Sequence, residues 1–467
     1  MIQERRKPMK VKLLMLFVVL CCFLTGCSVV GMEPQGLMQP PRATGDKQNV
    51  YDALEQVIGH NSFALKYPRT GEHRSAIIMH DITGNGVEDA IAFYQEDQEK
   101  MPGTVITFLS KKDKDWTLVG SYQSAATQVD RVAFGDMDGD GADEVIVGWG
   151  NAVTGISEVS AYAYDSAAGK MNEIGASDSA SRQFYNELVL ADFNGDGSVE
   201  IFTASLGTAE YPANGKLLGI SKDNKFEVLS SVELDRDVNQ YNHISVGQVD
   251  QNTVGVLLDG TKTSSQLVTE LVYWDKTNQV LKAPFDSSST AQNVNPTIRK
   301  IPIYSESQEG NDQLRFPILE LMPGYPADAL DSSVYLTHWY RYDTASGMTL
   351  RESTHYINLK DCYSLSIPQS WAGKVTAQAD ENKHTVTFYE WKVANETNQT
   401  GSRGDALLKI QAVNKNQWET MKTDDSLFLL MEKDDIVYVG SIPNQGNRLA
   451  LTAEQVKADF APFYQEE

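Results

Sequence analysis

An acidic, glycine-containing segment recurs in this chain at an almost constant interval, and this repeat constrains the fold more than any other feature. Its three copies occupy residues 78–89, 133–144 and 190–200, and their first aspartates, Asp81, Asp136 and Asp192, are 55 and 56 residues apart. A further 56 residues lead to Gln248, in a copy that lacks the acidic loop but keeps the apolar run after it. A longer fifth copy, also without the loop, covers about 314–343. Such a period is typical of a solenoid or a propeller.

Each copy is built from short runs of strand-forming residues. After the second acidic segment, VIVGW at 145–149, EVSAYAY at 158–164 and MNEI at 171–174 are separated by turns of Gly, Asp, Asn and Ser. These runs are too short for helices, and their spacing is that of antiparallel strands. We therefore predict a mainly β fold, with about five propeller-like repeats over residues 48–355.

A second module follows the repeats. Residues 363–371 (YSLSIPQSW), 384–391 and 406–413 begin a different pattern of strands. Residues 453–464 place apolar groups at helical spacing, with Thr452 and Gln455 in capping-box positions. We predict a smaller α+β domain over residues 356–467.

The repeats resemble a known family. The segment Phe134-Gly-Asp-Met-Asp-Gly-Asp-Gly141 is similar to FG-GAP or VCBS-type repeats of integrin α-chain-like β-propellers. The resemblance implies four-stranded blades arranged around an axis. The C-terminal pattern looks like PsbP or Mog1-like modules attached to bacterial lipoproteins.

The second acidic loop has the composition of a calcium site. Carboxylates lie at its positions 1, 3, 5 and 9, and Ca²⁺ prefers six to eight oxygen ligands from a tight turn. An EF-hand needs Glu at position 12 on a helix, whereas position 12 here is Val147 in a β-rich run, so that motif is excluded. The predicted ligands are Asp136, Asp138, Asp140, Glu144 and the Ala142 carbonyl.

The other two loops offer fewer carboxylates. The carboxylate count falls from four in the second loop to three in the third and two in the first, and we expect calcium affinity to fall in the same order. The alternative is a set of Asx-turns that bind no metal. The predicted ligands are Asp192, Asn194, Asp196, Glu200 and the Ser198 carbonyl in the third loop, and Asp81, Thr83, Asn85, Asp89 and the Val87 carbonyl in the first.

The N-terminus has the features of an export signal. Five basic residues precede the apolar run 13–24, which at 12 residues is shorter than the roughly 20 needed to span a bilayer. Leu24-Thr-Gly-Cys27 resembles the bacterial lipobox, which implies cleavage after residue 26 and acylation of Cys27. Residues 1–26 are the predicted signal peptide and 27–47 a flexible tether. We expect a lipid anchor in the cell membrane, with the folded part on the extracytoplasmic face.

Composition and motifs limit the function. The net charge of -23 argues against a nucleic-acid partner, because phosphate contact needs a basic surface. The chain contains no recognisable catalytic motif such as GxSxG or HExxH. We therefore predict a non-catalytic binding or scaffolding lipoprotein whose partner is an envelope or extracellular protein or glycan. An envelope enzyme acting on polysaccharide or peptidoglycan is the alternative.

Overall fold

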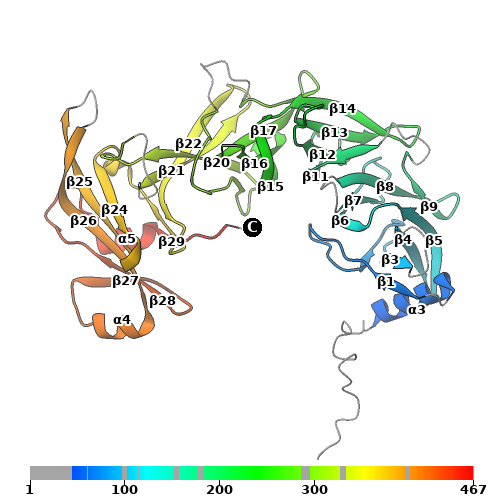
Figure 1. The fold of residues 1–467 in the computed structure, drawn as a ribbon, viewed down its shortest axis with the longest axis horizontal. Helices are drawn as coiled ribbons and strands as arrows, with labels where there is room; N and C mark the ends of the chain where they lie inside the picture. Colours follow the sequence, from blue (N-terminus) through cyan, green and yellow to red (C-terminus); the bar gives the residue numbers. More distant parts are fainter. Residues whose placement is uncertain are drawn as a thin grey trace, which may run out of the picture.

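A computed structural model describes residues 45–59, 62–96, 103–113, 115–151, 157–175, 182–264, 266–285, 295–326, 333–395 and 400–465. The described strands form six antiparallel sheets, which follow one another along an open arc (Figure 1). The predicted signal peptide, most of the predicted tether and Cys27 lie outside the described residues. In the described ranges, none of the helices combines the length and the apolar character needed to span a bilayer.

The first two sheets contain five strands each, and both contain one strand besides the four of a simple meander. In the first, β1 and β2 both pair with β3, and in the second β9 and β10 both pair with β8. Their members are β1 (Phe63–Leu65), β2 (Ile77–His80), β3 (Asp89–Glu96), β4 (Thr104–Lys112) and β5 (Asp115–Ser124), then β6 (Gln128–Gly135), β7 (Glu144–Gly150), β8 (Ser157–Asp165), β9 (Lys170–Glu173) and β10 (Gln183–Tyr185).

The third and fourth sheets are four-stranded meanders in chain order. They consist of β11 (Glu187–Ala191), β12 (Glu200–Ser205), β13 (Asn214–Ile220) and β14 (Phe226–Glu233), then β15 (Val238–Asp250), β16 (Thr253–Lys262), β17 (Leu267–Asp275) and β18 (Val280–Lys282). In the fourth copy a tight turn joins β15 to β16 where the first three copies have the acidic loop.

Neighbouring sheets stack face to face with like strands adjacent. The first strands β11 and β15 contact one another, as do the last strands β5 and β9, and β14 and β18. Apolar side chains from both faces fill the space between sheets, as in the cluster of Phe193, Phe202, Val256 and Trp274. This is the arrangement of propeller blades, so the predicted mainly β fold with propeller-like repeats and a smaller α+β domain is confirmed. Among the described residues, no strand of the first sheet pairs with the last, so strand pairing does not close the arc.

The fifth sheet joins the repeats to the C-terminal part. It consists of β19 (Glu306–Ser307), β20 (Leu314–Leu321), β21 (Tyr335–Asp343), β22 (Met348–Asn358), β23 (Tyr363–Ser366) and β29 (Phe460–Pro462). The predicted domain boundary at residue 356 therefore lies inside β22. Because β29 comes from the end of the chain and pairs with β23, the last residues complete this sheet.

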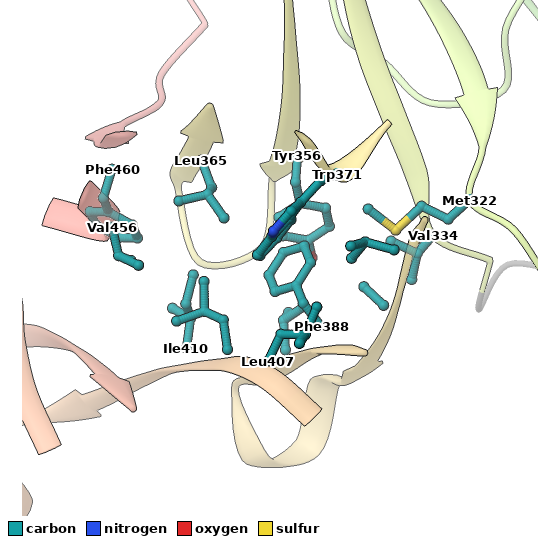
Figure 2. Packing of buried hydrophobic residues seen from close by; sticks show 14 of the residues in the cluster. Met322, Val334, Tyr356, Leu365, Trp371, Phe388, Leu407, Ile410, Val456 and Phe460 are labelled. Carbon is teal, nitrogen blue, oxygen red and sulfur yellow. The ribbon is translucent and has the colours of Figure 1, made fainter. Parts of the chain in front are cut away.

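The sixth sheet packs against the fifth with helices at its margins. Its strands are β24 (Val375–Asp380), β25 (Thr385–Asn395), β26 (Thr400–Asn414), β27 (Leu427–Lys433) and β28 (Ile436–Ser441). Figure 2 shows the shared core, in which Trp371 and Phe388 lie between Tyr356 of β22 and Leu407 of β26. Trp371 is 1% exposed, and its indole Nε1 donates a hydrogen bond to the Leu449 carbonyl at 2.8 Å.

The described helices are short, and each directly precedes or follows a strand. The described ones are α3 (Asp46–Ile58), α4 (Lys415–Met421) and α5 (Ala453–Asp459), with 3-10 turns η2 (Gln369–Trp371) and η3 (Glu381–Lys383). The predicted capping box of Thr452 and Gln455 is present at α5. The helix predicted over 453–464 ends earlier, because Phe460 to Pro462 become β29 and exchange helical hydrogen bonds for pairing with β23.

Candidate functional site

The three acidic loops lie in a row at the same end of neighbouring sheets. Each joins the first strand of a repeat to the next: β2 to β3, β6 to β7, and β11 to β12. The Val199 amide of the third loop donates to the Asp136 carbonyl of the second at 2.8 Å. A Cβ placed on Gly84 of the first loop would lie 3.2 Å from Ala142 of the second. The loops therefore brace one another.

All three loops share one backbone turn. The first aspartate accepts hydrogen bonds from amides three to five residues later, as Asp136 does from Gly139 at 2.7 Å and Gly141 at 2.9 Å. Gly139 and Gly141 have φ values of 77° and 90°, in a region that disfavours residues with a Cβ. The predicted carbonyl ligands, Ala142, Ser198 and Val87, occupy equivalent places, and each amide donates to the side-chain oxygen two residues earlier.

In the second loop the fold gathers three carboxylates. Asp136, Asp138 and Glu144 each offer an oxygen within 4.8 Å of the others. Glu144 is 2% exposed and its carboxylate accepts the Met137 amide at 2.7 Å. Burial raises the pKa of Glu144 to about 8, with the charges of Asp138 and Asp140 adding to the effect. The carboxylate of Asp140, although predicted as a ligand, is outside this group and accepts the Ala142 amide at 2.8 Å.

The third loop repeats the arrangement. Asp192, Asp196 and Glu200 offer oxygens within 4.8 Å of one another, and Glu200 is 3% exposed. Burial raises the pKa of Glu200 to about 7. The Asn194 side-chain nitrogen donates to Glu200 at 2.5 Å and to Asp196 at 3.0 Å, whereas its oxygen, the predicted ligand atom, accepts the Asp196 amide at 2.7 Å. Both groups consist of oxygen donors, which suit a hard cation such as Ca²⁺.

The first loop differs from the other two. Asp89 is fully buried and accepts hydrogen bonds from the Thr83 hydroxyl at 2.9 Å and the Lys111 amide at 3.1 Å. Asp81 accepts the Asn85 amide at 3.1 Å. In the described part of the chain, no third carboxylate joins these two. This geometry corresponds to the Asx-turn interpretation, and the predicted weaker affinity of this loop stays a prediction.

A contact that the sequence did not reveal links the first sheet to the second loop. His80 Nε2 lies 2.8 Å from an Asp143 carboxylate oxygen, and the His80 ring stacks on Phe134 with centroids 3.8 Å apart. In the sequence His80 is adjacent to Asp81 of the first loop, yet its side chain reaches the second loop. Its partner is 63 residues away, so adjacency in sequence could not identify it.

A polar cleft of about 530 Å³ opens beside the second and third loops. Its lining includes Asp138, Asp196 and Glu200, together with Tyr164 of β8 and Lys222 of the turn after β13. One carboxylate of the second loop and two of the third therefore border a space that a solute can enter.

Comparisons with known proteins return structural matches only. No family model matches this chain, and neither does any curated protein sequence. Solved structures that match include a rhamnogalacturonan lyase of Bacillus licheniformis (TM-score 0.28, 13% identity, 53% of this chain and 56% of the lyase). Another is the Dos1 propeller (TM-score 0.26, 10% identity, 82% of this chain and 81% of that chain). A third is the periplasmic gluconolactonase of Pseudomonas aeruginosa (TM-score 0.26, 11% identity, 67% of this chain and 93% of that chain). The chain thus spans little more than half of the lyase.

These matches correct one prediction from the sequence. The chain was predicted not to be an enzyme because it contains no recognisable catalytic motif. The matched structures include a lyase and a gluconolactonase, so that exclusion was wrong. A site assembled from several strands or sheets has no local sequence signature, which is why its absence from the sequence excludes nothing. At this low identity, no substrate or activity passes from these proteins to this chain.

Proposed function

We propose that this chain is a calcium-stabilised, FG-GAP/VCBS-like propeller protein that binds a partner at the cell envelope. The observation that carries the proposal is the pair of carboxylate groups, Asp136–Asp138–Glu144 and Asp192–Asp196–Glu200, each with oxygens within 4.8 Å. In this proposal Cys27 is acylated and holds the protein on the extracytoplasmic face of the membrane. The partner is an envelope or extracellular protein or glycan.

Calcium stabilises the loops because their carboxylates repel one another. Glu144 and Glu200 are almost fully buried, and burial disfavours their charged forms. A divalent cation between the carboxylates favours those charged forms and replaces repulsion with attraction. Since the cation binds the folded loop far better than the unfolded chain, it stabilises the fold by mass action.

The loops also hold neighbouring sheets in fixed positions relative to one another. The Val199–Asp136 backbone bond and the His80–Asp143 contact join the three loops, so a cation in one loop restrains its neighbours. The cleft beside Asp138 and Asp196 is then a preformed surface for a polar ligand. Loops on a rigid scaffold are where binding sites concentrate.

The first test measures the effect of calcium on stability. Thermal unfolding of the full chain in detergent is followed with excess calcium or with a chelator. Calcium at about 100 times its Kd should add about 2.7 kcal/mol of stability for each occupied site. Asp136→Asn combined with Asp192→Asn should remove most of this gain.

The matched control is Asp343→Asn. Asp343 also accepts turn hydrogen bonds, from the Ala345 amide at 3.0 Å and the Ser346 hydroxyl at 2.9 Å, but it belongs to neither carboxylate group. It should lower stability slightly and leave the calcium effect intact. Identical unfolding curves with calcium and with chelator would contradict calcium binding and leave only the Asx-turn interpretation.

Partner binding is tested with envelope fractions. The purified full chain should retain an envelope protein or glycan in the presence of calcium and release it with chelator. The same preparation is assayed for turnover of peptidoglycan and polysaccharide. Turnover without a retained partner would favour the alternative function, an envelope enzyme, over the binding role.

A further inference from the structure

The fifth sheet contains a hydrogen-bonded series of a hydroxyl, an imidazole and a carboxylate on one face. His338 of β21 lies directly opposite Thr354 of β22, and Glu320 of β20 reaches the same ring. His338 Nδ1 is 2.8 Å from the Thr354 hydroxyl, and His338 Nε2 is 2.8 Å from the Glu320 carboxylate. None of these residues belongs to the acidic loops.

The partners of His338 determine which ring nitrogen holds the hydrogen. A carboxylate can only accept, so Nε2 carries the hydrogen and donates it to Glu320. The Arg351 guanidinium lies 3.3 Å from Nδ1 and can only donate, so Nδ1 carries no hydrogen and acts as an acceptor. The same nitrogen faces the Thr354 hydroxyl. The imidazole is therefore oriented to take the hydroxyl proton.

Exposure in this region allows a substrate to approach. The His338 side chain is 6% exposed, whereas that of Glu320 is 64% exposed. Thr354 is half-buried and Arg351 is exposed. Tyr340 lies beside the imidazole, with ring centroids 6.5 Å apart. The imidazole is thus largely shielded from water, whereas the side chains of Glu320 and Arg351 beside it are exposed.

We propose that Thr354, His338 and Glu320 form a hydrolytic site for small carboxylic esters, with Thr354 as nucleophile, His338 as general base and Glu320 as a positioning residue. This arrangement of nucleophile, base and orienting carboxylate is the one that activates a hydroxyl for acyl transfer. The activity is separate from the calcium-dependent binding role.

The reaction proceeds in two steps, acylation of Thr354 and hydrolysis of the acyl-threonine. The Thr354 hydroxyl attacks the ester carbonyl carbon while its proton moves to His338 Nδ1. The bond to the leaving alcohol then breaks, and the alcohol takes that proton. Water next attacks the acyl-threonine, His338 again takes a proton and returns it to Thr354, and the carboxylic acid leaves.

The same sheet provides a matched control. His355 Nε2 lies 3.0 Å from the Ser353 hydroxyl, so this second pair has a similar separation. Within the described residues, however, no carboxylate bonds to His355. Burial lowers the pKa of His355 to about 4, and Arg315 contributes to the effect. We expect Ser353→Ala to leave ester hydrolysis unchanged.

The test uses the full chain with p-nitrophenyl acetate as substrate and a fluorophosphonate as covalent probe. We expect slow hydrolysis and, by peptide mass spectrometry, an adduct on Thr354. Thr354→Val should lose both, and Thr354→Ser should keep both. His338→Gln should lower kcat/KM by about 100-fold or more. Glu320→Gln should lower kcat and move the acidic limb of the pH–rate profile to lower pH, because the imidazolium loses its carboxylate partner.

Three outcomes would overturn the proposal. They are no turnover and no adduct in the wild-type chain, an adduct on another residue with Thr354 unmodified, or full activity in Thr354→Val. Melting curves identify any variant that fails to fold. Because the adduct is measured on the wild-type chain, the assignment of Thr354 does not depend on the stability of His338→Gln.

Discussion

The ion pair between Asp259 and Arg299 supports the sharpest prediction about stability. Both side chains are fully buried, with Arg299 Nη2 2.7 Å from Asp259 Oδ1. Arg299 also donates to the Ile303 carbonyl at 2.6 Å, and Asp259 accepts the Ser305 amide at 2.7 Å. The pair therefore fastens the segment 295–305, which leads into the fifth sheet, onto the fourth. We consider the substitution Arg299→Met, which keeps much of the volume and removes the charge.

The expected loss in the free energy of unfolding follows from the charge that remains on Asp259. Removing one partner of a buried ion pair leaves the other charge uncompensated, which costs about 3–5 kcal/mol. Replacing both partners, in Asp259→Leu with Arg299→Met, removes the buried charge and should return about half of that loss. Full recovery is not expected, because the Ser305 amide and hydroxyl lose their acceptor.

Urea unfolding of the full chain, followed by tryptophan fluorescence, measures both free energies. Hydrogen exchange adds a local readout, because the amides of Leu267 and Arg299 bond to each other's carbonyls at 2.8 and 2.9 Å and should lose protection. The control is Arg341→Met. Its salt bridge to Glu352 is 38% and 28% exposed, and should be worth at most about 1 kcal/mol. If Arg299→Met costs no more than Arg341→Met, the reasoning is wrong.

Three further predictions concern other parts of the chain. Burial raises the pKa of Glu270 to about 8, above its unfolded value of 4.5. The contribution of Glu270 to stability is therefore present below pH 4.5 and is lost as the pH rises to 8. Urea titrations at several pH values should show that Glu270→Gln flattens the fall in stability over this window. Trp371→Ala should cost about 3–5 kcal/mol in urea unfolding, whereas Tyr211→Ala, at a side chain 69% exposed, should cost less than about 0.5 kcal/mol. Cys27→Ala should move the protein from the membrane to the soluble fraction, and an unchanged distribution would contradict the lipid anchor.

Features whose chemistry is local were predictable from the sequence. The interval between Asp81, Asp136 and Asp192 predicted stacked repeats, and the loops form where the glycines allow left-handed backbone. The strands after the second loop and the capping box at Thr452 follow the same rule, since alternation, turn residues and caps act over a few residues. Glu144 and Glu200 could be predicted as ligands because each lies eight residues after its first aspartate, within one turn.

Only the tertiary structure determines which distant side chains meet. His80 and Asp143 are 63 residues apart and Asp259 and Arg299 are 40 apart, and neither pair has a sequence signature. Thr354, His338 and Glu320 meet because the register of β20, β21 and β22 places them on one face. A shift of one residue in either pairing would turn those side chains to opposite faces. Register and sheet stacking depend on the packing of the whole core, so these sites could not be predicted from local patterns.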